Sequence, residues 1–206
     1  ANGTNLGFNF YYLPGSSGFI NNSSISNLNN FTGSNGININ TTNVEISNIT
    51  INNSLGYALN ISGGSPTIKN STLFNNTGGI NIWNASPTLV NITISTNASA
   101  LTDAGLNITN SNNGSLSNIT IVNQTFGIVF TNSNLTLNNI TIDNSTYGLF
   151  PKSSSIINLI DSIITNTRVN SGYLNSSSIL FNISSNSSNA TFINVSYVNY
   201  SFMGNN

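Results

Sequence analysis

Short runs of alternating apolar and polar residues recur along most of the chain at a nearly constant spacing. One period contains GINIW (79–83), SPTLV (86–90) and ITI (92–94). Such alternation predicts β-strands with one buried face, and no segment shows the spacing of an amphipathic helix. The pattern therefore predicts an all-β protein with three short strands in each period.

Within this period the alternation slips by one residue at Asn91, because Leu89 and Ile92 must both point inward. A one-residue slip requires a bend in the backbone, and Asn tolerates the left-handed conformation that such a bend uses. The same arrangement recurs around Asn48, Asn118 and Asn139. We therefore expect a sharp bend at one Asn in each period.

Two columns of equivalent residues define the repeat. The bend column has spacings of 21, 22, 21, 27, 21, 22 and 21 residues and consists of Asn27, Asn48, Asn70, Asn91, Asn118, Asn139, Asp161 and Asn182. An independent column of small residues keeps the same phase and consists of Gly36, Ala58, Gly79, Gly105, Gly127, Gly148 and Gly172. Two columns in phase at this period indicate a solenoid. The long period has extra residues between Asn91 and Gly105, where a protruding loop is expected.

Three short strands and one Asn bend in each coil of about 22 residues make the chain similar to the right-handed parallel β-helix of the pectate-lyase-like superfamily. The resemblance implies eight or nine coils, at about 4.8 Å per coil a rod about 40 Å long. It also implies that the bend-column side chains stack into a buried, hydrogen-bonded ladder. The richness in Asn, Ser and Thr further resembles the adhesin-like surface proteins of methanogenic archaea.

The two ends differ from the repeat. Residues 1–20 are expected to form an aromatic capping or docking segment, and residues 21–206 the β-helix. The first segment carries Phe8, Phe10, Tyr11 and Tyr12. Terminal coils expose unpaired strand edges, which must be covered or will pair with another chain. The aromatic segment either caps its own molecule or pairs with a neighbouring copy, which would build a head-to-tail homopolymer.

Asn, Ser and Thr supply most of the polar side chains, and more than half of the Asn residues begin an Asn-x-Ser/Thr sequon. The chain has 45 Asn and 55 Ser plus Thr, so random placement predicts about 12 sequons, whereas the sequence contains 26. Alternating strands alone would make Asn-x-Asn similarly common, yet it occurs four times. We therefore expect covalent N-glycans. The expected acceptors lie in turns, at Asn52, Asn75, Asn84, Asn97, Asn113, Asn123, Asn134 and Asn144. The sequons of the bend column are assigned to the ladder, because a buried stacked amide cannot carry a sugar.

Charged residues are rare, with three Lys plus Arg against four Asp plus Glu. This composition gives no basic surface for nucleic acid and no carboxylate cluster for metal-dependent or acid/base cleavage of polysaccharides. The chain has no Cys or His, so thiolate and imidazole chemistry are excluded, and we expect neither enzyme activity nor a cofactor. Arg168 is expected near Asp143 or Asp161 as a structural pair.

No apolar run approaches the roughly 20 residues of a membrane span, so membrane insertion is not expected, and Ala1 is compatible with cleavage of a signal peptide. An ice-binding face would need a wide regular array, whereas the positions beside the outward Thr50, Thr72, Thr93, Thr120 and Thr141 are irregular. The sequence favours a secreted structural protein of a cell-surface filament, sheath or surface layer. The alternative is an adhesin that binds glycans or host protein.

Overall fold

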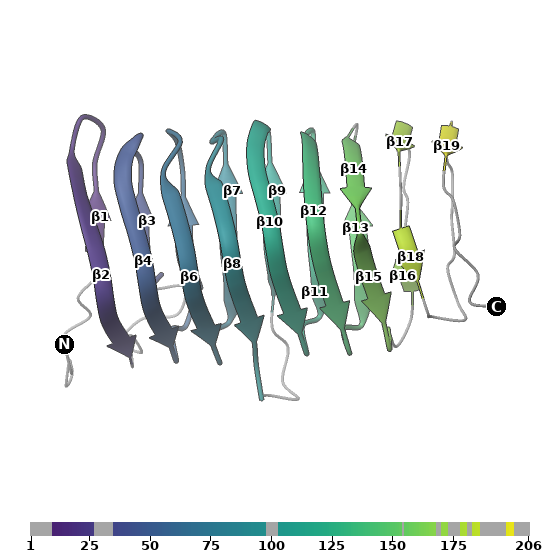
Figure 1. Cartoon of the computed structure of the whole chain (residues 1–206), viewed down its shortest axis with the longest axis horizontal. Coiled ribbons are helices and arrows are strands. Elements are labelled where there is room, and N and C mark those ends of the chain that lie inside the picture. Colours follow the sequence, from purple (N-terminus) through teal and green to yellow (C-terminus); the bar gives the residue numbers. More distant parts are fainter. Residues whose placement is uncertain are drawn as a thin grey trace.

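The structure is a stack of β-strands that runs from one end of the molecule to the other (Figure 1). This computed structural model describes residues 10–26, 35–97, 103–153 and 155–167, and the backbone of 170–172, 178–180, 183–185 and 197–199. All described regular elements are strands, and all of their pairings are parallel.

The chain alternates between two large parallel sheets. Sheet 1 has eight strands in the order β1 (Phe10–Tyr12), β3 (Ile37–Ile39), β5 (Tyr57–Ile61), β7 (Gly78–Trp83), β9 (Ala104–Thr109), β11 (Phe126–Thr131), β13 (Tyr147–Pro151) and β16 (Asn170–Gly172). Sheet 2 has nine strands and contains β2 (Ser17–Ser26), β4 (Asn43–Asn52), β6 (Thr67–Phe74), β8 (Thr88–Ser95), β10 (Asn112–Val122), β12 (Asn134–Asp143), β14 (Ile156–Ile160), β15 (Ser162–Thr165) and β18 (Ile183–Ser185). Two further strands, β17 (Ser178–Leu180) and β19 (Tyr197–Asn199), pair with each other.

The predicted parallel β-solenoid is therefore confirmed, with a difference in how each turn divides into strands. The segments SPTLV and ITI belong to one continuous strand, β8, and Asn91 forms a bend inside it with φ 56°. Each of the other long strands of sheet 2 from β2 to β12 likewise contains a left-handed Asn. The turns from β1–β2 to β11–β12 thus have two strands rather than three, because the bend changes the direction of the strand without ending its hydrogen-bonded pairing. In the following turn, the bend at Asp161 separates β14 from β15.

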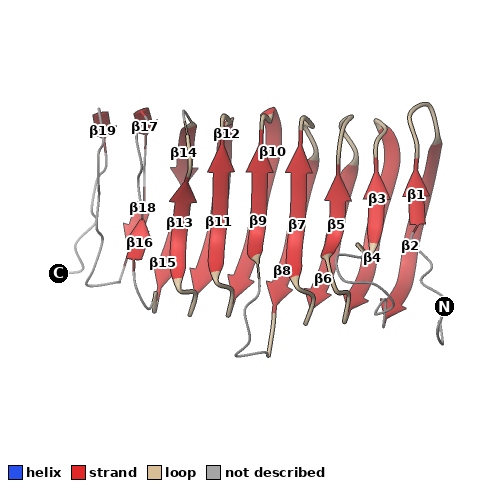
Figure 2. Cartoon of the chain, turned by 180° about the vertical axis from the view of Figure 1, so that it is seen from behind, coloured by secondary structure: helices blue, strands red, loops and turns tan. Residues whose placement is uncertain are grey.

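Six successive turns are described with strands in both sheets, from β3–β4 to β13–β15, compared with the eight or nine expected. The two kinds of connection lie at opposite edges of the stack (Figure 2). Strands β1 and β2 add one more turn before these six, and β16 and β18 continue the sheets after them. Successive sheet 2 strands from β4 to β8 align at offsets of 21 or 22 residues, which agrees with the spacing read from the sequence.

Equivalent apolar residues stack on each other inside the solenoid. One row runs through Leu73, Ile94, Ile121 and Ile142, and each of these side chains is at most 1% exposed. In-register parallel pairing places the same position of each turn above the last, so a β-branched or leucine side chain packs on its own counterpart. The alternating pattern of the sequence therefore becomes one continuous core.

The small-residue column occupies positions in sheet 1 where the neighbouring strand and the core leave little space for a side chain. A Cβ atom added to Gly127 would lie 2.5 Å from the carbonyl oxygen of Gly148 and 2.6 Å from Cγ2 of Ile142. Real Cβ atoms do not approach other heavy atoms so closely. The column therefore allows adjacent turns to approach each other.

The first turn begins earlier than expected. Residues Phe10–Tyr12 form β1, which pairs with β3, and Ser17–Ser26 form β2, which pairs with β4 in register. The boundary expected at residue 21 is therefore too late, since residues 10–20 belong to the solenoid. Its aromatic residues hid the repeat because Phe10, Tyr11 and Phe19 stand where later turns have smaller or polar side chains.

Candidate functional site

Asparagine forms most of the bends of the solenoid. Sixteen described residues other than glycine have positive φ, and all are Asn except Asp161. The left-handed conformation is costly for other L-residues, and the short polar side chains of Asn and Asp tolerate it by local hydrogen bonding. Much of the unusual Asn content therefore has a structural cause. The sequence alone identified only one such bend in each period.

The bend column forms a hydrogen-bonded row on the outside of sheet 2. Nδ2 of Asn91 donates to Oδ1 of Asn70 at 2.9 Å, Asn118 donates to Asn91 at 2.9 Å, and Asn139 donates to Asn118 at 2.7 Å. These four side chains are exposed. The expectation that the stacked amides are buried is wrong, because the left-handed bend turns their side chains outward, away from the core.

The ends of the bend column differ from the sequence assignment. Asn48 donates to Oδ1 of Asn21 at 3.0 Å. The register of β2 and β4 places Asn22 opposite Asn48, and Asn22 has φ 49°, so Asn22 and not Asn27 holds this position in the first turn. Asp161 has the same left-handed backbone with φ 50°. Asn27 and Asn182 lie outside the described residues.

Three of the expected glycan acceptors belong to a second row of amides, which lies in the connections that follow the strands of sheet 2. Nδ2 of Asn75 donates to Oδ1 of Asn53 at 2.7 Å, and Nδ2 of Asn144 donates to Oδ1 of Asn123 at 2.6 Å. Asn75, Asn123 and Asn144 are half-buried. A fourth expected acceptor, Asn52, is also half-buried, and its Oδ1 is buried without a hydrogen-bond partner. The remaining expected acceptors are all exposed and are Asn84, Asn97, Asn113 and Asn134.

A third row of amides crosses the outer face of sheet 1, and the sequence reading missed it. Asn60 donates to Asn38 at 2.9 Å, Asn81 to Asn60 at 2.8 Å, and Asn107 to Asn81 at 2.8 Å. The spacings are 22, 21 and 26 residues, which match the small-residue column. The available signal was an Asn between two apolar residues in the first strand of four successive periods, before Val129 and Phe150 take this position.

Tyr57 lies on the outer face of sheet 1 and contacts Asp103, in the long connection between β8 and β9. Its hydroxyl donates to Oδ2 of Asp103 at 2.8 Å, and its ring covers Gly78, where an added Cβ would lie 2.5 Å from Cδ1 of Tyr57. Burial raises the pKa of the Tyr57 hydroxyl, and the hydrogen bond and negative charge of Asp103 raise this pKa further. Asp103 lies within the segment between Asn91 and Gly105 where the sequence predicts the extra residues, and residues 98–102 of this segment lie outside the described chain.

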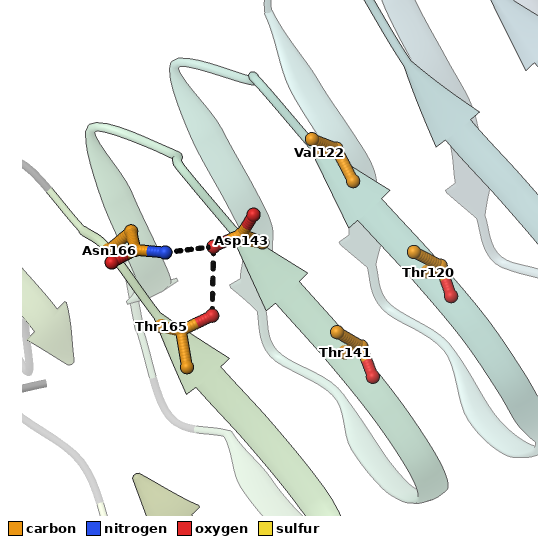
Figure 3. A pocket seen from close by; sticks show the side chains of 6 residues that line it. All are labelled: Thr120, Val122, Thr141, Asp143, Thr165 and Asn166. Carbon is orange, nitrogen blue, oxygen red and sulfur yellow. Dashed lines mark hydrogen bonds between the residues drawn. The ribbon is translucent and has the colours of Figure 1, made fainter. Parts of the chain in front are cut away.

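A shallow groove of about 570 Å³ lies on the outer face of sheet 2 beyond the bend (Figure 3). Its lining residues come from β10, β12, β15 and the turn after β15 and are Thr120, Val122, Thr141, Asp143, Thr165 and Asn166. Oδ1 of Asp143 accepts hydrogen bonds from Oγ1 of Thr165 at 2.8 Å and from Nδ2 of Asn166 at 2.7 Å. Arg168, the expected partner of Asp143 or Asp161, lies outside the described residues.

Residues 35–206 match the family model described as "Right handed beta helix region". The chain belongs to this family. The match includes six of the described turns and assigns them the right hand. No curated protein matches the β-helix chain. Membership therefore establishes the fold, whereas any chemistry depends on this chain's own side chains.

The described part of the β-helix contains no group of three or more Asp, Glu, His or Cys side chains placed to hold a metal ion. Nζ of Lys69 lies 2.5 Å from Oε1 of Glu45, and both side chains are about half exposed. Asp143, in the groove, is the carboxylate best placed to contact a ligand. It can accept a hydrogen bond from a ligand, but it has no second carboxylate beside it in the groove lining for paired acid and base work. The described residues contain no helix with the length and apolarity of a membrane span.

Proposed function

We propose that this β-helix is a secreted, N-glycosylated structural protein of a cell surface, without enzyme activity, and that its copies associate end to end. The observation that supports this proposal is the apolar N-terminal turn. Phe19 is 78% exposed, Tyr11 and Leu13 are each 62% exposed, and Phe10 is 40% exposed. Four large apolar side chains exposed in one terminal turn are typical of an interaction surface.

The strand edges of this turn support the same proposal. β1 and β2 are the outermost strands of their sheets in the described chain, and each has a pairing partner on one side only. The outermost strand of a sheet can pair through its backbone with a strand of another chain. The contact differs from the one expected from the sequence, because Phe10, Tyr11 and Tyr12 form the first strand and are not a separate docking arm. Phe8 lies outside the described residues.

A contact between opposite ends of two solenoids does not close on itself and therefore propagates as a fibre. Beyond the first turn the sides are suited to solvent, since most of the exposed residues on the outer face of sheet 2 are Asn, Thr or Ser. Glycans on these faces would keep the sides apart and leave the ends free. The scarcity of charge means that the end contact depends on apolar burial and backbone pairing rather than on ion pairs.

The test uses the double variant Phe19→Asp with Tyr11→Asp. Both side chains are exposed, so the charges are tolerated in the single molecule, but they would be costly in a buried contact. We expect the wild-type protein to sediment as polymers and the double variant as a folded monomer. Trp83→Asp is the matched control, because Trp83 is 49% exposed and lies on β7, several turns away from the first turn. Polymers that survive the double substitution, or a wild-type protein that is monomeric, would refute assembly through this turn.

A second candidate function is that of an adhesin. The observation that favours it is the outer face of sheet 1, where exposed Trp83 lies two residues beyond Asn81 on the same strand, beside the amide row. Aromatic rings beside amide donors and acceptors are suited to sugars, which present both apolar faces and hydroxyl groups. A monomeric wild-type protein that binds immobilised oligosaccharides, and loses this binding on Trp83→Ala, would favour the adhesin.

A further inference from the structure

We propose that the exposed bend column, Asn48, Asn70, Asn91, Asn118 and Asn139, carries N-linked glycans. This inference rests on the proposed glycosylation and names the residues that hold the sugars. It reverses the assignment made from the sequence, which reserved these residues for a buried ladder. The structure removes the reason for that assignment, since all five side chains are exposed.

The hydrogen bonds of the row leave one hydrogen of each amide free for substitution. Nδ2 of Asn118 donates to Oδ1 of Asn91, and Oδ1 of Asn118 accepts from Nδ2 of Asn139. An Asn amide has two N–H groups, and the row uses one of them. N-glycosylation replaces one hydrogen with the anomeric carbon of a sugar. The stack and the sugar therefore require different hydrogens of the same nitrogen.

The geometry of the row also determines which hydrogen remains. Within one amide, the donated N–H and the accepting C=O point in opposite directions along the stack, toward the previous and the next turn. A substituted secondary amide prefers the trans form, in which its N–H is likewise opposite to its C=O. The N–H that survives glycosylation is thus the one that the row uses. The sugar then extends from the bend into solvent, and the amide row remains intact.

The residue two positions after each bend provides an independent observation. Every Asn in the column from Asn48 to Asn139 is followed at this position by a threonine, namely Thr50, Thr72, Thr93, Thr120 and Thr141. In the turn whose bend residue is Asp161, which cannot accept a glycan, the equivalent residue is Ile163. Thr and Ile are both β-branched and both suit an outward strand position. Strand propensity alone does not explain why the hydroxyl is absent where the acceptor is absent.

The next outward position along the same strands strengthens this comparison. It holds Asn52, Phe74, Ser95, Val122 and Asp143 in successive turns. The outer face therefore does not require a hydroxyl in general. Of these two outward positions, only the one that completes the Asn-x-Thr sequon holds threonine in all five turns. The competing acceptors Asn75, Asn123 and Asn144 have the same Asn-x-Thr sequence, but they are half-buried and less open to a sugar.

The covalent step requires a sugar donor, which would be an oligosaccharide activated as a phosphate or diphosphate ester of a lipid. The C–O bond between the anomeric carbon and the phosphate breaks, and a C–N bond forms to Nδ2 of the Asn. The lipid phosphate leaves with the bonding electrons, and the proton lost from Nδ2 passes to a base of the transferring enzyme. No oxidant or reductant is involved.

Mass spectrometry of intact glycopeptides from the native protein tests the proposal. The chain has three Lys plus Arg but 18 Tyr and Phe, so chymotrypsin separates the acceptors better than trypsin. Electron-transfer fragmentation then locates each glycan. We expect glycans on the bend column and lower occupancy at Asn75, Asn123 and Asn144. Glycans confined to Asn84, Asn97, Asn113 and Asn134 would overturn this inference and leave the glycoprotein proposal standing. A bare chain of 21.8 kDa would overturn both.

Variants made in the native host sharpen the test. Thr93→Val keeps a β-branched residue but removes the acceptor sequence of Asn91, so the protein should lose one glycan. Thr88→Val is the matched control on the same strand and should lose none. Asp161→Asn combined with Ile163→Thr should add one glycan, whereas Ile163→Thr alone should add none. An unchanged intact mass after both Thr93→Val and the Asp161 and Ile163 double substitution would contradict the proposal.

Discussion

Replacement of Asn91 in unglycosylated protein tests how the bends hold the solenoid together. Asn91 has φ 56°, donates to Asn70 at 2.9 Å and accepts from Asn118 at 2.9 Å. Each of these exposed hydrogen bonds contributes about 0.5–1 kcal/mol. Alanine loses both bonds and must also adopt the left-handed conformation, which costs it about 1–2 kcal/mol. We therefore expect Asn91→Ala to lower the free energy of unfolding by about 2–4 kcal/mol.

Glycine at the same position separates the backbone cost from the hydrogen bonds. Asn91→Gly loses the same bonds but adopts positive φ freely, with a cost of about 0.4–1 kcal/mol from its more flexible unfolded chain. Glycine should therefore be better tolerated than alanine by about 0.5–1 kcal/mol. Asn134 is the control, because it is exposed and does not have positive φ. There alanine should be better tolerated than glycine, since glycine weakens a strand.

Urea unfolding followed by far-ultraviolet circular dichroism measures all four variants. The order of stability should reverse between the two sites, with glycine above alanine at Asn91 and alanine above glycine at Asn134. The same order at both sites would show that the left-handed backbone of Asn91 has no energetic role. Losses below about 0.5 kcal/mol for both Asn91 variants, the level of ordinary surface substitutions, would refute the contribution of the amide row.

Three further substitutions test other parts of the structure. Ile94→Ala removes a side chain that is 1% exposed within a continuous apolar row, and urea unfolding should show a free energy of unfolding lower by about 2–5 kcal/mol. A decrease below about 1 kcal/mol would contradict the close packing of this row. Asp161→Asn supplies the missing donor opposite Asn139, so the unfolding free energy should rise by about 0.5–1 kcal/mol, and a decrease would contradict continuation of the row. The pKa of Tyr57 is raised above its ordinary value of 10.0, so the unfolded chain loses the hydroxyl proton at a lower pH than the folded chain. The free energy of unfolding should therefore fall as pH rises above 10, by at most about 1.4 kcal/mol per pH unit. Tyr57→Phe should remove this component of the alkaline loss in pH-dependent urea titrations, and identical slopes for both proteins would refute it.

The sequence was sufficient to predict the solenoid because its columns depend on period and phase alone. Leu89 and Ile92 located the bend at Asn91, and Gly127 and its equivalents gave the period a second, independent column. The exposure of the bend column could not be read in this way. It depends on the direction in which a left-handed residue projects its side chain between two inward neighbours, and alternation does not record that direction.

The same limit applies to the other amide rows and to the first turn. From the sequence, Asn75 and Asn144 were expected to lie free in loops. In the structure their side chains form hydrogen bonds to the neighbouring coil, and these bonds depend on how the loops of successive coils align as well as on the register of the strands. Residues 10–20 were assigned to a separate segment because Phe10 and Tyr11 do not resemble the later repeats. Strand pairing depends on the backbone, so β1 joins sheet 1 despite its different side chains.

Electron cryomicroscopy of the purified native protein tests end-to-end assembly most directly. The account predicts unbranched fibres in which the solenoid axis coincides with the fibre axis, with a strand repeat of about 4.8 Å that continues through the contact between subunits. The turn that contains Phe19 and Tyr11 should lie buried at that contact. A population of single, separate solenoids, or fibres joined through the sides of sheet 1 or sheet 2, would contradict it.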